Sequence, residues 1–107
     1  MITKQFANKY GWSDVDAFEI VKVVSDQTVE VRALDAELAD GWKPEFIPGG
    51  FSAICVNIRD QQWKFNSNPE NKVIRIRFSK RKNIWQDAYG GKYDLSDTPI
   101  KYYDYNF

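Results

Sequence analysis

Side chains that support catalysis are sparse in this sequence. It contains no histidine, which excludes a histidine-dependent nucleophilic triad and a histidine-ligated metal site. Its one cysteine, Cys55, lies between Ile54 and Val56 in an apolar segment, so we interpret it as a buried structural thiol. A single cysteine cannot form an intramolecular disulfide, and this favours a reducing compartment.

Two further patterns resemble ligand sites. Asp14, Asp16 and Glu19 could supply oxygen ligands to Mg²⁺ or Ca²⁺, but the glycine and glutamate that an EF-hand loop needs at its sixth and twelfth positions are absent. A solvated acidic segment is the favoured interpretation. Pro48-Gly49-Gly50-Phe51 lacks the order of a phosphate-binding loop and precedes a predicted strand, which favours a turn. We therefore predict no catalytic residue, no metal and no cofactor, and a non-enzymatic role.

The strongest charge feature is a basic strip over residues 72–82. No acidic residue occurs between Glu70 and Asp87. Three interpretations fit: contacts to phosphates with base stacking on nearby rings, contacts to an acidic protein, or a solvated strand face whose cations block aggregation. The zero net charge of the chain counts against a dedicated nucleic-acid binder. The strip consists of Lys72, Arg75, Arg77, Lys80, Arg81 and Lys82.

Charge and aromatic residues both suggest a binding surface. Residues 1–53 contain five basic and nine acidic residues, whereas residues 54–107 contain ten and six. Aromatic residues make up 16% of the chain, more than a small core can hide, so some rings should lie at the surface. The predicted contact residues are Trp12, Trp42, Arg75, Arg77, Lys80, Arg81, Lys82, Trp85 and Tyr89.

The clearest structural signal is a β-hairpin. Residues 17–24 are rich in β-branched side chains, Ser25-Asp26-Gln27 is a turn cluster, and residues 28–34 alternate between apolar and polar side chains. Residues 73–79 alternate in the same way, which places Ile74 and Ile76 on one face and Arg75 and Arg77 on the other.

The rest of the chain is predicted to contain further short strands and one helix. Leu34 and Leu38 are four residues apart, and Gly41 could end a helix over residues 34–40. Residues 42–50 are predicted to form a loop. Additional strands are expected at residues 51–58, 61–66, 84–88, 92–95 and 98–105.

These patterns predict a mainly β fold, either all-β or α+β. It would be a small antiparallel barrel or a rolled sheet of six to eight short strands with at most one short helix. The length of 107 residues predicts a single domain over residues 1–107, with an N-terminal arm at residues 1–16 and the β domain at residues 17–105. The start of the chain does not resemble a signal peptide, and no segment approaches the ~20 apolar residues that span a bilayer. We expect a cytoplasmic protein.

As a set, seven segments resemble a group of small bacteriophage and mobile-element proteins of about this length. The resemblance implies an origin rather than an activity, and supplies no catalytic residues. The segments are Tyr10-Gly11-Trp12, Val15-Asp16-Ala17-Phe18 with Val21–Val24, Thr28-Val29-Glu30-Val31-Arg32, Gly49-Gly50-Phe51 with Cys55 and Asn57, Trp63, Ile74-Arg75-Ile76-Arg77, and Tyr102-Tyr103-Asp104-Tyr105.

Small phage accessory proteins often bind a host protein or nucleic acid. We therefore predict a non-enzymatic protein-binding module, a phage-encoded inhibitor or adaptor that acts on a host protein. The alternative is a small nucleic-acid-binding β-barrel that uses residues 72–82. The sequence leaves the oligomeric state and the partner open.

Overall fold

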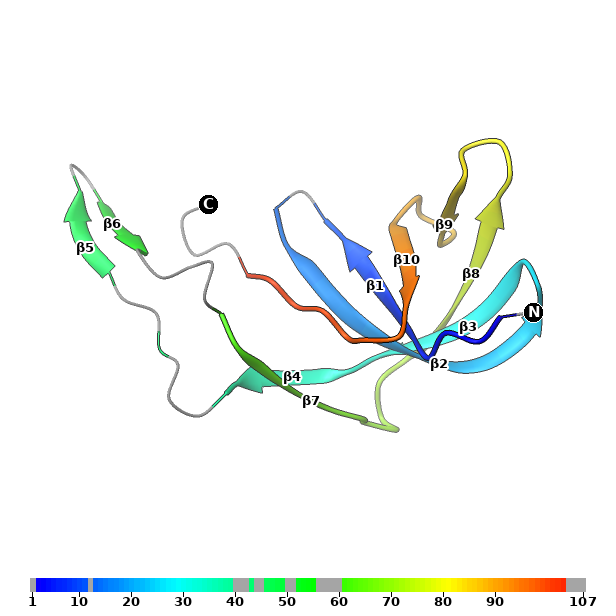
Figure 1. The fold of residues 1–107 in the computed structure, drawn as a ribbon, viewed down its shortest axis with the longest axis horizontal. Coiled ribbons are helices and arrows are strands. Elements are labelled where there is room, and N and C mark those ends of the chain that lie inside the picture. The colour runs from blue at the N-terminus through cyan, green and yellow to red at the C-terminus, as the bar shows by residue number, and fades with distance from the viewer. Residues whose placement is uncertain are drawn as a thin grey trace.

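The computed structural model describes residues 2–11, 13–39, 43, 46–49, 52–55 and 61–103. Over these residues the chain forms ten β-strands and no helix (Figure 1). The predicted mainly β fold is confirmed. Within the same residues, no helix is long and apolar enough to cross a membrane.

Six of the strands form a closed antiparallel barrel, which confirms the predicted barrel architecture. Neighbouring strands follow the order β1-β10-β9-β8-β3-β2, and β1 also pairs with β2 to close the ring. Closure gives most of the barrel backbone a hydrogen-bonding partner and removes most of the open sheet edge. The strands are β1 (Phe6–Tyr10), β2 (Val15–Ser25), β3 (Thr28–Ala33), β8 (Val73–Ser79), β9 (Ile84–Gln86) and β10 (Lys92–Ser96).

The predicted hairpin is the pair β2–β3. Its turn is closed by the backbone N–H of Gln27, which donates to the Ser25 hydroxyl over 3.2 Å. In β3 the alternation predicted from sequence places Val29 and Val31 in the interior with no exposed surface. Strand β3 then pairs with β8 on its other side, so the hairpin supplies two of the six barrel strands.

The core consists of apolar side chains from opposite sides of the barrel. Ile76 of β8 is fully buried, while Arg75 and Arg77 beside it are exposed, which confirms the predicted alternation of this strand. Phe18 of β2 contacts Tyr93 of β10 edge to face, with ring centroids 5.4 Å apart. The buried cluster is Ala7, Phe18, Val29, Val31, Ile76 and Tyr93.

The prediction of an N-terminal arm is wrong for residues 6–10, because these residues form β1 between β2 and β10. Ala7 has no exposed surface and lies in the core. The segment looks polar because only one residue in two faces the interior. Asn8 is also fully buried, under the chain near the C-terminus.

The predicted helix over residues 34–40 is wrong. Residues 35–38 form strand β4 (Asp35–Leu38), which pairs with β7 (Trp63–Asn66) in a two-stranded ribbon leading away from the barrel (Figure 1). Leu38 lies opposite Trp63, so its apolar contact comes from a distant segment. About two helical turns are marginal in isolation, and this long-range pairing overrides the local preference.

The predicted loop over residues 42–50 is wrong for residues 46–49. These form β5 (Phe46–Gly49), which pairs with β6 (Ser52–Cys55) in a second ribbon. Residues 56–58 of the predicted strand, and the burial predicted for the Cys55 side chain, lie outside what the structure describes.

The predicted C-terminal strand is reduced to a single bridge within residues 98–103. The backbone groups of Tyr102 and Val15 exchange two hydrogen bonds of 2.9 Å. The buried Asn8 amide holds the segment further back, because it donates to the Thr98 carbonyl (3.2 Å) and accepts from the Ile100 N–H (2.9 Å). The segment therefore packs against the outside of β1 and β2, and residues 104–105 of the prediction lie outside the described chain.

Candidate binding surface

The outer face of β8 and β9 carries polar side chains that the strand register aligns. Arg77 lies directly opposite Gln86 of β9, Gln86 lies opposite Lys92 of β10, and Lys92 lies opposite Tyr10 of β1. Directly opposed residues project to the same side, with Cβ atoms about 5 Å apart. These four residues therefore form a continuous row across four strands of the barrel exterior.

The two arginines of β8 differ in how their charge is used. Arg75 donates through Nη2 to Glu30 Oε2 of β3 over 2.9 Å, and both partners are partly exposed. Arg77 has no ion-pair or hydrogen-bonding partner among the described residues. Its guanidinium is therefore available to an anionic group of another molecule.

A shallow hollow of about 350 Å³ lies beside this row, lined by Arg75, Arg77, Gln86, Asp87 and Ala88. The next residue, Tyr89, is 97% exposed. A tyrosine ring with almost no contacts in the folded chain is unusual for so large an apolar group. The hollow brings together two of the sequence-predicted contact residues, Arg75 and Arg77, and a third, Tyr89, directly follows its lining residue Ala88.

The turn that presents Tyr89 is built around the buried carboxylate of Asp87. That carboxylate accepts hydrogen bonds from the backbone N–H of Tyr89 (2.9 Å) and Gly91 (2.8 Å) and from the Tyr93 hydroxyl (2.9 Å), and Lys9 Nζ lies 3.8 Å away. Burial alone would raise the pKa of Asp87, but these hydrogen bonds and Lys9 outweigh it, so the pKa is lowered. Burial and the bond to Asp87 raise the pKa of Tyr93.

The structure explains why glycine occupies both positions 90 and 91 of this turn. Gly90 has a φ of 85°, a backbone conformation that residues other than glycine rarely adopt. At Gly91 a Cβ atom would lie 2.6 Å from Oδ2 of Asp87, too close for van der Waals contact. The turn therefore has a fixed shape, and Tyr89 is held at its tip.

The other sequence-predicted contact residues do not join this hollow. Trp85 is half-buried on the interior side of β9, opposite Tyr93, and its ring packs 5.6 Å from that of Phe78. Lys80, Arg81 and Lys82 are exposed in the turn before β9, at the end of that strand away from Tyr89. Trp12 and Trp42 lie outside the described residues.

The acidic group near the N-terminus is divided between separate contacts. Asp16 accepts from Lys101 Nζ over 2.7 Å, whereas Glu19 accepts from Arg32 and the Ser67 hydroxyl. Residues three apart on a strand face opposite sides, so Asp16 and Glu19 do not converge. In the described part of the chain, no three His, Cys, Asp or Glu side chains gather as a metal site.

Gln86, Lys92 and Tyr10 belong to the surface but were not predicted from sequence. They come from three strands, and only the register places them beside Arg77. The sequence contained one usable signal, since Lys92 follows the Gly-Gly turn directly and must lie near the strand before that turn.

No protein-family model, curated protein or solved structure is significantly similar to this chain. The resemblance to phage and mobile-element proteins stays a prediction.

Proposed function

We propose that this protein is a non-enzymatic binding module that engages an acidic surface of a partner protein through the hollow beside Arg77 and the Tyr89 turn. A phage-encoded inhibitor or adaptor that acts on a host protein in the cytoplasm would work in this way. The observation that carries the proposal is that Arg77, which has no partner among the described residues, lines a hollow whose residue Ala88 directly precedes the 97% exposed Tyr89.

The residue types of this surface support the proposal. Arginine and tyrosine are enriched among residues that dominate binding energy at protein interfaces, and such residues sit in pockets from which water is excluded. Arg77 supplies a planar donor that matches a carboxylate, and Tyr89 supplies apolar area on a turn that is already ordered. A preformed turn lowers the entropic cost of binding.

The lowered pKa values of three carboxylates also favour binding over catalysis. Glu19, Asp35 and Asp87 have lowered pKa values, and each carboxylate is held by hydrogen bonds within the chain. A general acid or base needs a pKa near the working pH, whereas these groups stay ionised and bonded. Their arrangement is that of structural carboxylates.

The experiment is affinity capture from bacterial cell extract with the wild-type protein, Arg77→Glu and Tyr89→Ala, followed by quantitative mass spectrometry. We expect one protein at near-stoichiometric yield with the wild type. Its recovery should fall by about tenfold or more with Arg77→Glu, because a favourable charge contact becomes a repulsive one.

Lys72→Glu is the matched control. It makes the same change of charge at an exposed position before β8, outside the hollow. Equal recovery of the partner with Arg77→Glu and with the wild type contradicts the proposal. So does the absence of any stoichiometric partner.

A specific observation also favours nucleic-acid binding as the second candidate. All five cations between residues 77 and 92 are exposed and have no partner among the described residues: Arg77, Lys80, Arg81, Lys82 and Lys92. The inward position of Trp85 counts against it, because this ring is not on the outer face where it could stack on a base. Fluorescence anisotropy with single- and double-stranded probes tests it, and binding should weaken steeply as salt rises.

A further inference from the structure

Strand β2 continues beyond the strand that covers it. β1 pairs with β2 as far as Glu19, and one more hydrogen bond joins the Ile20 N–H to the Gln5 carbonyl over 2.9 Å. Within the described chain, Val21–Ser25 pair only with β3. This part of β2 therefore has a free hydrogen-bonding edge.

A β-bulge decides which side chains lie at this edge. The register shifts by one residue at Val21, so Lys22 lies opposite Glu30 on the outside and Val23 lies opposite Val29. Val29 is fully buried, which places Val23 on the interior side of the sheet. Val23 is nevertheless 47% exposed. An interior-facing valine is thus left uncovered where the neighbouring strand is missing.

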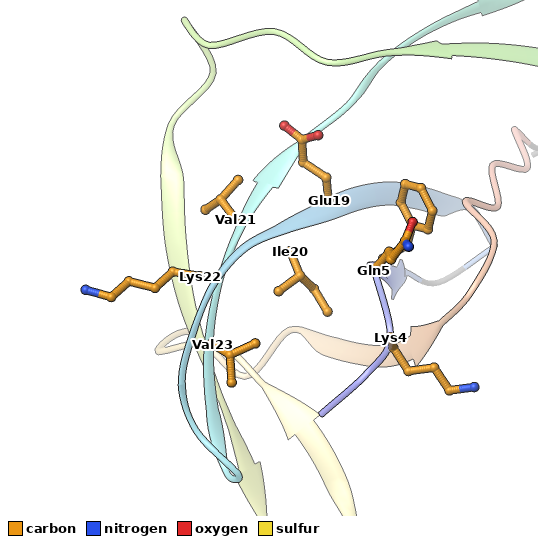
Figure 2. A pocket seen from close by; sticks show the side chains of 8 residues that line it. Lys4, Gln5, Glu19, Ile20, Val21, Lys22 and Val23 are labelled. Atoms are coloured by element: carbon orange, nitrogen blue, oxygen red, sulfur yellow. The ribbon is translucent and has the colours of Figure 1, made fainter. Parts of the chain in front are cut away.

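A hollow of about 400 Å³ lies along this edge. Figure 2 shows Ile20 and Val23 between β2 and the segment that carries Lys4 and Gln5, while Lys22 projects to the other side. Val21 and Val24 are 40% and 43% exposed. The lining residues are Lys4, Gln5, Phe6, Glu19, Ile20, Val21, Lys22 and Val23.

The uncompensated charge at this edge is basic. Glu19 is neutralised by Arg32 and accepts a further hydrogen bond from Ser67. Lys22 has no partner among the described residues, and Lys4 contacts only the well-exposed Asp97, a surface pair that contributes little. A ligand with negative charge therefore complements this edge.

We propose that the Val21–Val24 edge of β2 binds an extended segment of a partner protein by strand addition. The segment pairs with the free backbone groups, places apolar side chains over Ile20 and Val23, and directs a carboxylate to Lys22. It is short, because a second register shift lies between Val23 and Ser25. This surface is separate from the hollow beside Arg77 and does not depend on it.

The edge has only part of the protection that natural sheets usually give to exposed strands, namely one lysine and the β-bulges. Proline and charged side chains commonly block such edges, and here Lys22 is the only charged residue among Val21, Lys22, Val23 and Val24. The valines have high β-propensity and favour further pairing. An edge left open beside an uncovered valine therefore fits a docking site.

The test uses a displayed library of random peptides selected on the intact protein. We expect enriched peptides to share alternating apolar residues with at least one acidic residue. Their binding should weaken by about tenfold in Val21→Lys, and by about as much in Lys22→Glu, because each change opposes one feature of the proposed segment. Amide NMR shifts caused by the peptide should centre on Val21–Ser25.

Val73→Lys is the matched control, since Val73 is a valine of similar exposure (46%) that lies opposite Arg32 of β3 and outside the hollow at the β2 edge. It should bind the peptides as the wild type does. Circular dichroism of each variant separates lost binding from lost fold. The proposal is overturned if no such peptides are enriched, if the shifts centre on β8 and β9, or if sedimentation shows that a second copy of the chain occupies the edge. None of these outcomes bears on the partner captured through Arg77.

Discussion

The outer face of β8 and the free edge of β2 are both exposed, but they offer different chemistry. At Arg77, strand β8 is paired on both sides, with Thr28 of β3 and Gln86 of β9, and the neighbouring Ile76 is fully buried. Beyond Ile20, β2 is paired on one side, and Val23 behind it is 47% exposed. The surface at Arg77 belongs to a fully paired part of the sheet, whereas the surface on β2 is a sheet edge with no further strand beside it.

This difference determines how each surface can bind. At Arg77 the backbone of β8 is paired with both β3 and β9, so the outer face there can bind only through side chains such as Arg77. Such binding should weaken as salt screens the charges. The edge of β2 offers backbone groups and apolar side chains, so its binding should depend much less on salt.

The largest expected effect on the free energy of unfolding concerns the apolar side chains that lie behind each surface, Ile76 and Val23. Ile76→Ala should lower the free energy of unfolding by ~2–5 kcal/mol, because it leaves a cavity in a closed core. Val23→Ala should cost about 1 kcal/mol or less, because that side chain is half in solvent already. Urea denaturation measures both. Equal losses of unfolding free energy in the two variants would mean that Val23 at the edge of β2 is as well packed as Ile76 of β8.

The next effect concerns the turn beside the hollow. Asp87→Ala should cost ~1–3 kcal/mol, because the Tyr93 hydroxyl and the two turn N–H groups lose a buried acceptor. Thermal unfolding measures this loss. Asp97→Ala is the control, since that side chain is 70% exposed and its change should be close to neutral. A fully stable Asp87→Ala would refute the role assigned to this carboxylate.

Acid should weaken the same turn. The pKa of Asp87 is lower in the folded protein than in the unfolded chain, so its contribution is present above about pH 4 and is lost as the pH falls through the folded pKa. Glu19 changes in the same direction. The free energy of unfolding should therefore fall on acidification, and less so in Asp87→Asn. Stability that rises as the pH falls would contradict this assignment.

The smallest effect is expected at the ion pair of Arg75 and Glu30. Arg75→Ala should change the free energy of unfolding by about 0.5 kcal/mol, because the arginine side chain is 48% exposed and water screens the pair. Denaturation at low and high salt measures it. A loss several times larger would show that the outer face of β8 contributes to stability as well as to binding.

The barrel strands were predictable because their signal is local. In residues 28–34 and 73–79 alternate side chains face a common interior, and the sequence alone shows that period. Strand β4 also alternates, with Ala36 and Leu38 half-buried and Asp35 and Glu37 exposed, but it is only four residues long, and the spacing of Leu34 and Leu38 suits a helix equally well. Its strand form depends on pairing with β7, which local sequence does not display.

The candidate surface was predictable only in part for a similar reason. Arg75 and Arg77 follow from alternation within one strand, and Tyr89 follows from its place in a glycine turn. Gln86 and Lys92 join Arg77 through the register between strands, which sequence does not fix. Trp85 is of a residue type common at interfaces, but its position in β9, opposite Tyr93, directs its side chain inward.

Under the proposed function, Arg77 serves binding rather than folding. The most direct test measures Arg77→Glu twice, by urea denaturation and by capture of the partner. We predict a free energy of unfolding within about 0.5 kcal/mol of the wild type, because Arg77 is exposed and has no partner among the described residues, together with loss of capture. Retained capture in the stable variant, or a loss of capture that merely follows unfolding, would contradict the account.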